Sequence, residues 1–422
     1  MDKKISRLNI ANATVLLVIF VLLDEVYKHI IVEVFGYMGF IIGSFNLFTN
    51  ILSYVIVVFA IFIINFTRKS LFSGFILELI ALFLLFPSII LYKDMHTDPE
   101  IVFAQLTFFL TAFVSLKYIK IRIKGKSLKN SQKAIFLFII VVIMIIPFFL
   151  KFKTHVNLKN FLLEDIYKTR IQQRELNNMY LAYTYSWLAK VIIPIAIVIA
   201  IAAKSRVKSI ILAMLLAYLF LVGAHKSLFF GTFMIFLFYY IKPIYIRISV
   251  SSGILFILTA SLLLYFIFNN YYVTGLIARR VFFIPALLDT HYFDFFKNKP
   301  LFWSASFLGP FIDYPYHLNP PHLIASYYFN KAEMSANNGI ISNGFANLGW
   351  LGIMINITAV SVIFSFFNSL NINHKFYGLF FVFFITLLSS ALPTVLLTHG
   401  GIILIFLSQF IMKDTQSGIL IK

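Results

Sequence analysis

The chain alternates between long apolar runs and shorter polar segments. A helix needs about 20 mainly apolar residues to cross the hydrocarbon core of a membrane, and backbone groups in lipid must be hydrogen-bonded internally. The runs lack the alternation, residue by residue, that a barrel strand shows. They predict about 11 to 12 membrane-spanning helices, at roughly 8–23, 44–66, 71–92, 100–117, 134–150, 183–203, 210–224, 227–241, 250–268, 344–366, 377–395 and 400–412.

Composition supports the same class of protein. Hydrophobic residues make up 61% of the chain and charged residues 12%, which would leave a soluble protein with a largely apolar surface. The sequence therefore predicts an all-α, polytopic integral membrane protein, with a single membrane domain over 1–422. The first apolar run ends at Asp24-Glu25 without a small-residue cleavage site, so it predicts an uncleaved anchor.

The distribution of charge predicts the orientation. Lys and Arg concentrate in loops that stay in the cytoplasm. With the N-terminus inside, the cytoplasmic segments hold 20 of the 35 basic residues and only two of the 16 acidic ones, Asp2 and Asp414. The net charge of +19 is then explained by topology and by attraction to anionic membrane lipids. We expect both termini in the cytoplasm and no nucleic-acid partner.

Several kinds of chemistry are excluded or unsupported. The chain has no cysteine, which excludes disulfides, thiol catalysis and thiolate metal sites. It also lacks a Walker-type phosphate loop and a repeat of fixed period. Catalysis would therefore use the polar groups that remain, most of which we expect in two long extracytoplasmic loops, 151–179 and 269–343.

The shorter loop predicts a helix along the membrane surface, because apolar residues recur there at helical spacing, at Leu163, Ile166, Tyr167 and Ile171. Arg170 and Arg174 would project from one face of that helix. Planar guanidinium groups bind phosphate oxygens bidentately and stay charged, so the pair is suited to a diphosphate. An ordinary solvated helix face, with Glu164 and Lys168 at the same spacing, is the alternative and the more usual explanation.

In the longer loop, Arg279-Arg280 directly precedes an apolar stretch that predicts a helix start. Cations at a helix entrance are disfavoured by the helix dipole, which indicates a ligand, although snorkelling arginines beside a span are as ordinary. Histidines and aromatic side chains follow, with the carboxylate of Asp294 among them. They suit a sugar-binding cleft, but Asp289 and Asp294 have no diagnostic catalytic spacing and can equally cap or turn the chain.

Two further polar groups lie in or against the predicted bilayer. Lys226 belongs to the short turn Gly223–Ser227 between two spans, where it can meet a lipid-linked phosphate or simply snorkel. Glu78 lies inside a predicted span, which makes it a functional candidate by default. Lys190 is predicted near the opposite membrane surface, so we do not expect the two to pair.

A family resemblance follows from the order of five motifs. They are Gly223-Ala224-His225-Lys226-Ser227, then Arg279-Arg280 with Phe282-Phe283-Ile284-Pro285, then Tyr292-Phe293-Asp294-Phe295-Phe296, then Ala336-Asn337-Asn338-Gly339, then Gly344-Phe345-Ala346-Asn347-Leu348-Gly349-Trp350-Leu351-Gly352. This order resembles the Wzy-type O-antigen and oligosaccharide repeat-unit polymerases. The topology is similar over nearly the whole chain, and the motifs over about 223–352.

The resemblance implies a glycosyltransferase of the bacterial inner (plasma) membrane that joins undecaprenyl-diphosphate-linked oligosaccharides on the outer face. In that family, basic residues of the two outer loops are functional, which carries over to Arg170, Arg174, Arg279 and Arg280. Some members have Gly eleven positions after such an Arg. Here those positions hold Leu181, Tyr185, Thr290 and His291, so the loop motif itself is absent.

The implied chemistry assigns roles to the candidate residues. Lys226 and the arginines would neutralise the leaving diphosphate without a metal or cofactor, since no acidic pair suited to a divalent metal is evident outside. Asn337 and Asn338 would contact substrate. The acceptor hydroxyl needs a base, for which we predict His322 or His291, and then Asp294.

Other readings of the sequence stay open. An O-antigen ligase shares the architecture and the lipid-diphosphate donor. A flippase of the same pathway has a similar helix count, but flippases usually carry charged residues in the central spans, whereas these spans read as nearly uncharged. A structural membrane anchor is the remaining alternative. Binding of a chain-length regulator protein is left open by the sequence.

Overall fold

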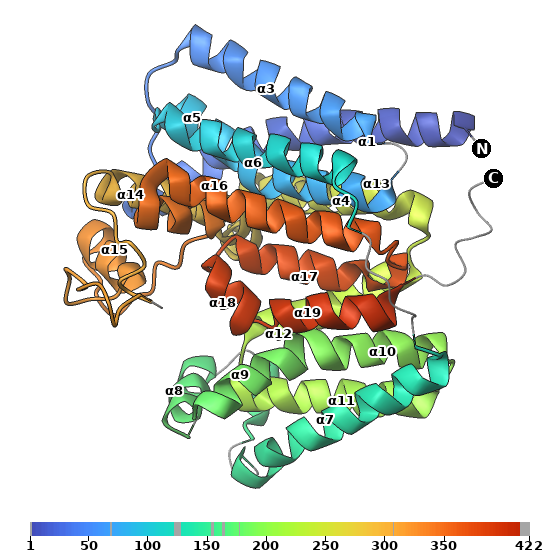
Figure 1. Cartoon of the computed structure of the whole chain (residues 1–422). Coiled ribbons are helices and arrows are strands. Elements are labelled where there is room, and N and C mark those ends of the chain that lie inside the picture. The colour runs from blue at the N-terminus through green and yellow to red at the C-terminus, as the bar shows by residue number, and fades with distance from the viewer. Residues whose placement is uncertain are drawn as a thin grey trace. The chain divides into compact units, whose positions relative to one another are not determined.

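A computed structural model describes residues 2–67, 70–121, 128–152, 156–162, 165–176, 178–306 and 308–413. All regular elements within these ranges are helices, which confirms the all-α prediction (Figure 1). Several helices contain a π-helical stretch, among them η1 (Tyr27–Ile31), η3 (Ala81–Leu85), η5 (Leu188–Ile192) and η7 (Thr274–Phe283). Such wider turns are rare and often lie at functional sites.

Eight helices in the described part of the chain are long and apolar enough to cross a membrane. They are Leu47–Phe66, Leu71–Met95, Pro99–Tyr118, Ser131–Phe152, Met179–Ala202, Arg206–Gly223, Pro243–Phe268 and Ile340–Ser369. Shorter apolar helices cover Phe230–Tyr240, His374–Leu387 and Gly401–Met412. Each of the twelve predicted ranges overlaps one of these segments or α1 (Asp2–Val26), but 377–395 continues past the helix end at Leu387 across the non-helical residues 388–391. The chain is a polytopic membrane protein.

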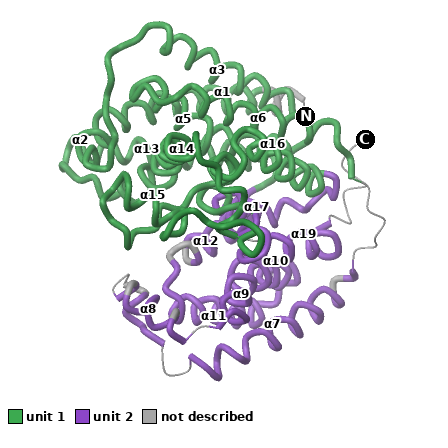
Figure 2. Tube along the Cα trace, turned by 60° about the vertical axis from the view of Figure 1, so that its left-hand side comes forward, with its two compact units in different colours: residues 1–121, 242–368, 387–392 green, residues 122–241, 369–386, 393–422 purple. Residues whose placement is uncertain are grey.

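The chain forms two compact units that alternate along the sequence, where one membrane domain was expected (Figure 2). Unit 1 comprises residues 1–121, 242–368 and 387–392. Besides α1 its main helices are α3 (Leu47–Phe66), α4 (Leu71–Ile80), α5 (Phe86–Met95), α6 (Pro99–Tyr118), α13 (Ile246–Phe268), α14 (Ile284–Phe296), α15 (Pro320–Phe329) and α16 (Ile340–Ser369). Helix α1 packs along α13, and α14 packs against α5 and α6.

Unit 2 comprises residues 122–241, 369–386 and 393–422. Its helices are α7 (Asn130–Phe152), α8 (Ile166–Leu176), α9 (Met179–Trp187), α10 (Ile193–Ala202), α11 (Arg206–Gly223), α12 (Lys226–Tyr240), α17 (Tyr377–Leu387), α18 (Leu392–Leu397) and α19 (Gly401–Leu407). Helix α10 is central, packing against α7, α11 and α12, and its apolar side chains are almost all buried.

The helix predicted in the shorter loop is present as α8, and Ile166 of its predicted apolar face is buried. Thr169 and Gln173 are buried, whereas Ile171 is 58% exposed. Hydrogen bonds explain why polar side chains of α8 are buried. Asn160 Nδ2 donates to Leu221 O at 2.9 Å, and the Asn160 side chain also bonds Thr169 Oγ1, so that α8 docks against α11. Leu163 and the side chain of Tyr167 lie outside the described residues.

Helix α16 is a hairpin of two helices, whereas the sequence predicted one straight span over 344–366. Leu348 and Gly349 have non-helical backbone angles, with φ of 57° at Gly349. Asn356 Nδ2 donates to Ile340 O at 2.8 Å, although these residues would be about 24 Å apart along a straight helix. The chain therefore folds back at Leu348-Gly349, and the long helix that follows begins near Trp350.

The segment 269–343 was predicted as one long polar loop, but its first half is helical. Helix η7 continues into α14, and Phe282, Phe283 and Tyr292 on this helix are buried. Phe282 stacks on Phe83 of η3 with ring centroids 5.0 Å apart. Apolar side chains thus bind this segment to the helices of unit 1, which a polar loop would not do.

Candidate functional site

Arg170 of α8 contacts the turn that the sequence singled out independently. Its Nε and Nη2 donate to Ala224 O at 3.2 and 3.0 Å. Ala224 ends α11 in the left-handed conformation, with φ of 49°, and so exposes its carbonyl to the guanidinium. Two segments 54 positions apart are thereby joined within unit 2. The side chains of Arg174 and Lys226 lie outside the described residues.

Helix α9 supports this turn from the other side. A Cβ added at Gly223 would lie 2.1 Å from Tyr185 Oη, so the close approach requires glycine there. Tyr185 donates to Leu219 O at 2.9 Å, and its ring centroid lies 5.4 Å from that of His225. His225 is the residue immediately before α12. The turn therefore presents His225 and the start of α12 beside Arg170.

Lys190 and His399 lie in the same unit and are hydrogen-bonded to each other. Lys190 Nζ is 2.9 Å from His399 Nδ1. Burial lowers the pKa of His399 to about 3, and the nearby charges of Lys190 and His225 act in the same direction. The turn that carries His399 is held by Trp187, whose Nε1 donates to Leu397 O at 2.7 Å. The sequence did not predict a site role for Lys190, His399, Trp187 or Leu397.

The charges of unit 2 are unbalanced around these residues. Its described part contains two carboxylates, Asp165 and Glu175, and both are exposed. Unit 1, in contrast, contains seven ion pairs between described residues. Cationic and hydrogen-bond-donating side chains that lie together attract anions. We call Arg170, Lys190, His225 and His399 the cationic cluster.

In unit 1, Tyr328 of α15 contacts two of the predicted catalytic residues, which both lie on α14. The His291 ring stacks on that of Tyr328, with centroids 4.0 Å apart, and Tyr328 Oη donates to Asp294 Oδ2 at 2.5 Å. His291 Nε2 is buried without a partner among the described residues. Burial lowers the pKa of His291 to about 4, although Asp294 opposes this, so the ring is neutral at pH 7.

His322 of α15 has the better geometry for a general base. Its Nδ1 lies 2.7 Å from Ala332 O. A carbonyl only accepts, so Nδ1 carries the proton and the lone pair is on Nε2. Its ring is half-buried, unlike that of His291. Among the predicted bases, His322 is therefore the one whose tautomer and exposure both suit proton abstraction.

The asparagines predicted to contact substrate differ in exposure. Asn337 is exposed, and its Oδ1 accepts from Ser335 Oγ at 2.9 Å. Asn338 is 7% exposed, and its Nδ2 is buried without a partner among the described residues. An amide donor that is buried and unsatisfied costs free energy, so Asn338 is the one of the two whose position a ligand or water would stabilise.

The predicted placement of Arg279 and Arg280 at a helix entrance is wrong. Both lie inside η7, which continues into α14 without a break. The Arg279 guanidinium lies 4.2 Å from the centroid of the Phe35 ring, and its Nη1 is 3.5 Å from Met38 Sδ. Arg280 is exposed. The helix dipole therefore gives no reason to expect a ligand at these arginines, and Arg279 packs against Phe35 and Met38.

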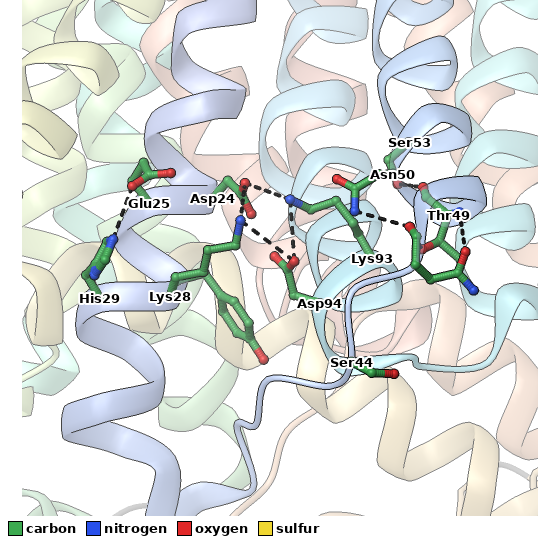
Figure 3. A network of polar contacts seen from close by, with 12 residues as sticks. Asp24, Glu25, Lys28, His29, Ser44, Thr49, Asn50, Ser53, Lys93 and Asp94 are labelled. Atoms are coloured by element: carbon green, nitrogen blue, oxygen red, sulfur yellow. Dashed lines mark hydrogen bonds and ion pairs between the residues drawn. The ribbon is translucent and has the colours of Figure 1, made fainter.

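A polar network of unit 1 was not predicted from the sequence (Figure 3). Lys93 lies between two carboxylates, with Nζ 2.6 Å from Asp24 Oδ2 and 3.4 Å from Asp94 Oδ1. Lys28 adds a contact of 2.9 Å to Asp24. Asp24 and Lys93-Asp94 each follow a predicted span, at ends that the predicted topology assigns to one membrane side. Their shared predicted depth in the membrane could have indicated from the sequence that these residues meet.

Glu78 was a candidate without a partner, and the structure supplies one. Glu78 Oε2 accepts from Asn12 Nδ2 at 2.8 Å and from Arg247 Nε at 3.0 Å, and Ser251 Oγ contacts Oε1. The sequence placed Arg247 before its span, but α13 already begins at Ile246. Glu78 is thus paired with an opposite charge, and low polarity penalises a lone buried charge.

Asp289 is buried inside α14 and neither caps nor turns the chain. Its Oδ2 accepts from Gln105 Nε2 at 2.8 Å. Burial raises the pKa of Asp289 from its ordinary value of 3.8 to about 7, against the opposing effects of Ser342 and Gln105. Between these values the folded protein keeps a proton that the unfolded chain releases. The stability contribution of Asp289 therefore declines as pH rises through this window.

We predict that Asp289→Asn removes this pH dependence, because the amide cannot ionise. Thermal midpoints at pH 5 and pH 8 provide the measurement, and the variant should gain relative to the wild type at pH 8. Asp313→Asn changes an exposed aspartate of the same unit and is the control, for which we expect no such gain. Equal midpoint shifts for the two variants at both pH values would contradict the assignment.

Comparisons with known proteins found no match to this chain among protein-family models, curated proteins or solved structures.

Proposed function

We propose that this protein is a glycosyltransferase of the bacterial plasma membrane that polymerises oligosaccharide units linked to undecaprenyl diphosphate. This is the activity of the Wzy-type polymerases that its motifs resemble. The observation that supports it is the contact of Arg170 with the turn Gly223–Ser227. Both segments were expected at the diphosphate from sequence alone, and the contact adds His225 and the start of α12 beside them.

The chemistry of the transfer requires such a cluster. The acceptor hydroxyl attacks the anomeric carbon of the donor sugar, the bond from that carbon to the diphosphate oxygen breaks, and the diphosphate leaves with an added negative charge. Fixed cations that meet this charge lower the barrier, and they do so most in a site that excludes water. Arg170 is such a cation, and its two hydrogen bonds to Ala224 O hold the guanidinium at the turn.

The hydroxyl proton needs an acceptor, for which we propose His322. Its Nδ1–H is held by Ala332 O, which leaves Nε2 as the acceptor and lets the ring become a cation after the transfer. His291 is the weaker candidate because its Nε2 is buried. In this proposal the cationic cluster faces the extracytoplasmic side, and both termini lie in the cytoplasm.

The test is the surface glycan of a strain in which the gene is deleted and then restored with variants. We expect Arg170→Ala to lower polymer formation roughly 100-fold, the usual effect of removing one donor to the developing charge. Gel analysis and mass spectrometry of surface and lipid-linked glycans would then show single capped units. Lys168→Ala removes an exposed cation of the same helix and is the control, for which we expect normal polymer.

Full-length polymer with Arg170→Ala would contradict the role of the cluster. Deletion of the gene tests the class of activity separately. Single units on the surface would support a polymerase, and full-length polymer retained on the lipid carrier would indicate an O-antigen ligase instead.

A lipid-linked oligosaccharide flippase is the second candidate, because the spans contain buried charge. Asp24, Lys93 and Asp94 form one network and Glu78 and Arg247 another, and ionisable groups inside membrane segments are typical of transport pathways. If transport is the function, deletion of the gene will trap single units on the inner leaflet, and no capped unit will reach the surface.

A further inference from the structure

The carboxyl groups of Asp24 and Asp94 share two ammonium groups but contact them unequally. Asp24 Oδ2 lies 2.9 Å from Lys28 Nζ and 2.6 Å from Lys93 Nζ. Asp94 Oδ1 lies 3.9 and 3.4 Å from the same two nitrogen atoms (Figure 3). Hydrogen bonds between an ammonium group and a carboxylate are usually about 2.7–2.9 Å long. The distances therefore place a negative charge on Asp24 and indicate a neutral Asp94.

Each of the two carboxyl groups also has a second oxygen that is buried and unpaired. Asp24 is 4% and Asp94 is 8% exposed. Asp24 Oδ1 and Asp94 Oδ2 have no hydrogen-bond partner among the residues that the structure describes. Ionised carboxylates only accept hydrogen bonds, so two of them cannot satisfy each other. A proton on one of these oxygens would make it a donor to the other.

The two side chains lie close enough for this bond, since a side-chain hydrogen bond between Asp24 and Asp94 acts on both groups. With the proton on Asp94 Oδ2, this oxygen donates to Asp24 Oδ1. Asp24 Oδ2 keeps its two short contacts, and Asp94 Oδ1 keeps its two longer ones. Every oxygen of the pair then has a partner, as buried polar groups usually do. Two ionised carboxylates in the same poorly solvated place would repel each other.

Other ionisable groups face the pair without satisfying its free oxygens. They are Glu25 of α1, Tyr27 of η1 and Tyr54 of α3. Tyr27 Oη donates to a backbone carbonyl of the segment before α3, and a carboxylate such as Glu25 only accepts. Helices α6, α14 and η7 also pack against α5, and charged groups there have partners elsewhere: Asp98 with Lys297, Asp289 with Gln105, and Arg279 with Phe35.

We propose that Asp24 and Asp94 bind one proton between them, which makes this network a proton-binding site among the membrane helices of unit 1. The network then holds two ammonium groups and one carboxylate. Its most exposed member is Lys28, whose side chain is 33% exposed, so we expect the proton to exchange with water. Ionisable groups inside membrane helices are typical of proton relays. The inference goes beyond sugar transfer, and neither proposal depends on the other.

Asparagine substitutions distinguish the two carboxyl groups, because an amide resembles a protonated carboxyl group. In Asp94→Asn the amide nitrogen can donate to Asp24 Oδ1 and the amide oxygen can accept from the lysines, so we expect a thermal midpoint close to that of the wild type. Asp24→Asn removes the one carboxylate beside two ammonium groups, and should lower the midpoint by roughly 5 °C or more. The measurement uses the full chain at pH 7 in nanodiscs of phosphatidylcholine.

Equal losses of stability in the two variants would overturn the proposal, because two ionised carboxylates would be about equally costly to replace. A larger loss in Asp94→Asn than in Asp24→Asn would overturn it as well, since the neutral member of the pair would then be the wrong one.

Infrared spectroscopy of the same samples detects the proton directly, because a protonated carboxyl group has a carbonyl band that a carboxylate lacks. The reference is the Asp289→Asn protein, since Asp289 itself retains a proton near pH 7. In this background we expect Asp94→Asn to remove one carboxyl band per chain. Asp313→Asn changes an exposed aspartate and should remove none. An unchanged carboxyl band in the Asp94→Asn protein would contradict the bound proton.

Replacing H2O with D2O tests the access of water to the site. Deuteration shifts the carbonyl band of a carboxyl group, and we expect this shift before the buried backbone amides of α1 and α5 exchange. A band that keeps its position after those amides have exchanged would show that the proton is not in contact with water, against the expected exchange.

Discussion

Replacing Lys93 with methionine is expected to destabilise the folded protein by about 3–5 kcal/mol, the usual cost of removing one partner from a buried ion pair. The Lys93 side chain is 1% exposed and bonds Asp24, which is also buried, at 2.6 Å. Without the ammonium, the carboxylates of Asp24 and Asp94 would face each other in a poorly solvated site. Unfolding in detergent micelles, followed by tryptophan fluorescence, provides the measurement.

Lys297→Met is the control for this prediction. Lys297 pairs with Asp98 at 3.6 Å in the same unit, but its side chain is 57% exposed. An exposed pair contributes about 0–1 kcal/mol, so we expect a small change. Adding Asp24→Asn to Lys93→Met should recover part of the loss, because it removes one uncompensated charge. Equal stability of the Lys93→Met and Lys297→Met proteins would contradict the network's role.

Gly352→Ala is the second substitution with a large expected effect, at about 3 kcal/mol or more of lost stability. A Cβ at Gly352 would lie 2.0 Å from Gly344 O, and one at Gly344 would lie 2.6 Å from Gly352 O. Neither contact is relieved by a side-chain rotation, because both atoms that meet the new Cβ belong to the backbone. The two helices of the α16 hairpin would have to separate.

The separation would also reach the segment beside α15. Asn347, at the end of the first helix of the hairpin, accepts from Trp303 N at 2.8 Å, and its neighbour Ala346 accepts from Leu301 N. We therefore expect Gly352→Ala to increase protease cleavage in the region of residues 301–319, as well as lowering the thermal midpoint.

Gly253→Ala is the matched control for the hairpin. Gly253 lies inside α13, and a Cβ there would meet no atom within 4 Å. Alanine favours a helix interior over glycine by up to about 1 kcal/mol, so this variant should be as stable as the wild type or more stable. A loss of stability in Gly253→Ala equal to that in Gly352→Ala would show that glycine replacement in these helices is harmful in general, and not at the hairpin alone.

Part of the candidate site could be anticipated from individual residues. Arg170 was expected at a phosphate because the hydrophobic pattern predicts a surface helix that projects it. The turn Gly223–Ser227 was expected there because it lies between two apolar runs and carries Lys226. The contact of Lys190 with His399 could not be anticipated. Lys190 lies inside one apolar run and His399 lies between two other apolar runs, so no sequence spacing links them. Their contact depends on how η5 and the turn before α19 meet in unit 2.

What the sequence by itself determined is the set of membrane helices. Each of the twelve predicted ranges overlaps a helix, although 377–395 continues past the end of α17 at Leu387 and 344–366 is broken at Leu348-Gly349. Backbone groups in lipid can be satisfied only within a helix or a closed barrel, and apolar runs of this length predict the former. Only the tertiary structure decided how the polar groups pair. Glu78 meets Arg247 from 169 positions away, and Asn356 meets Ile340 because α16 folds back at Gly349. Hydrophobic periodicity shows which residues face lipid, but the choice of partner among buried polar groups follows from which helices pack together and at what depth.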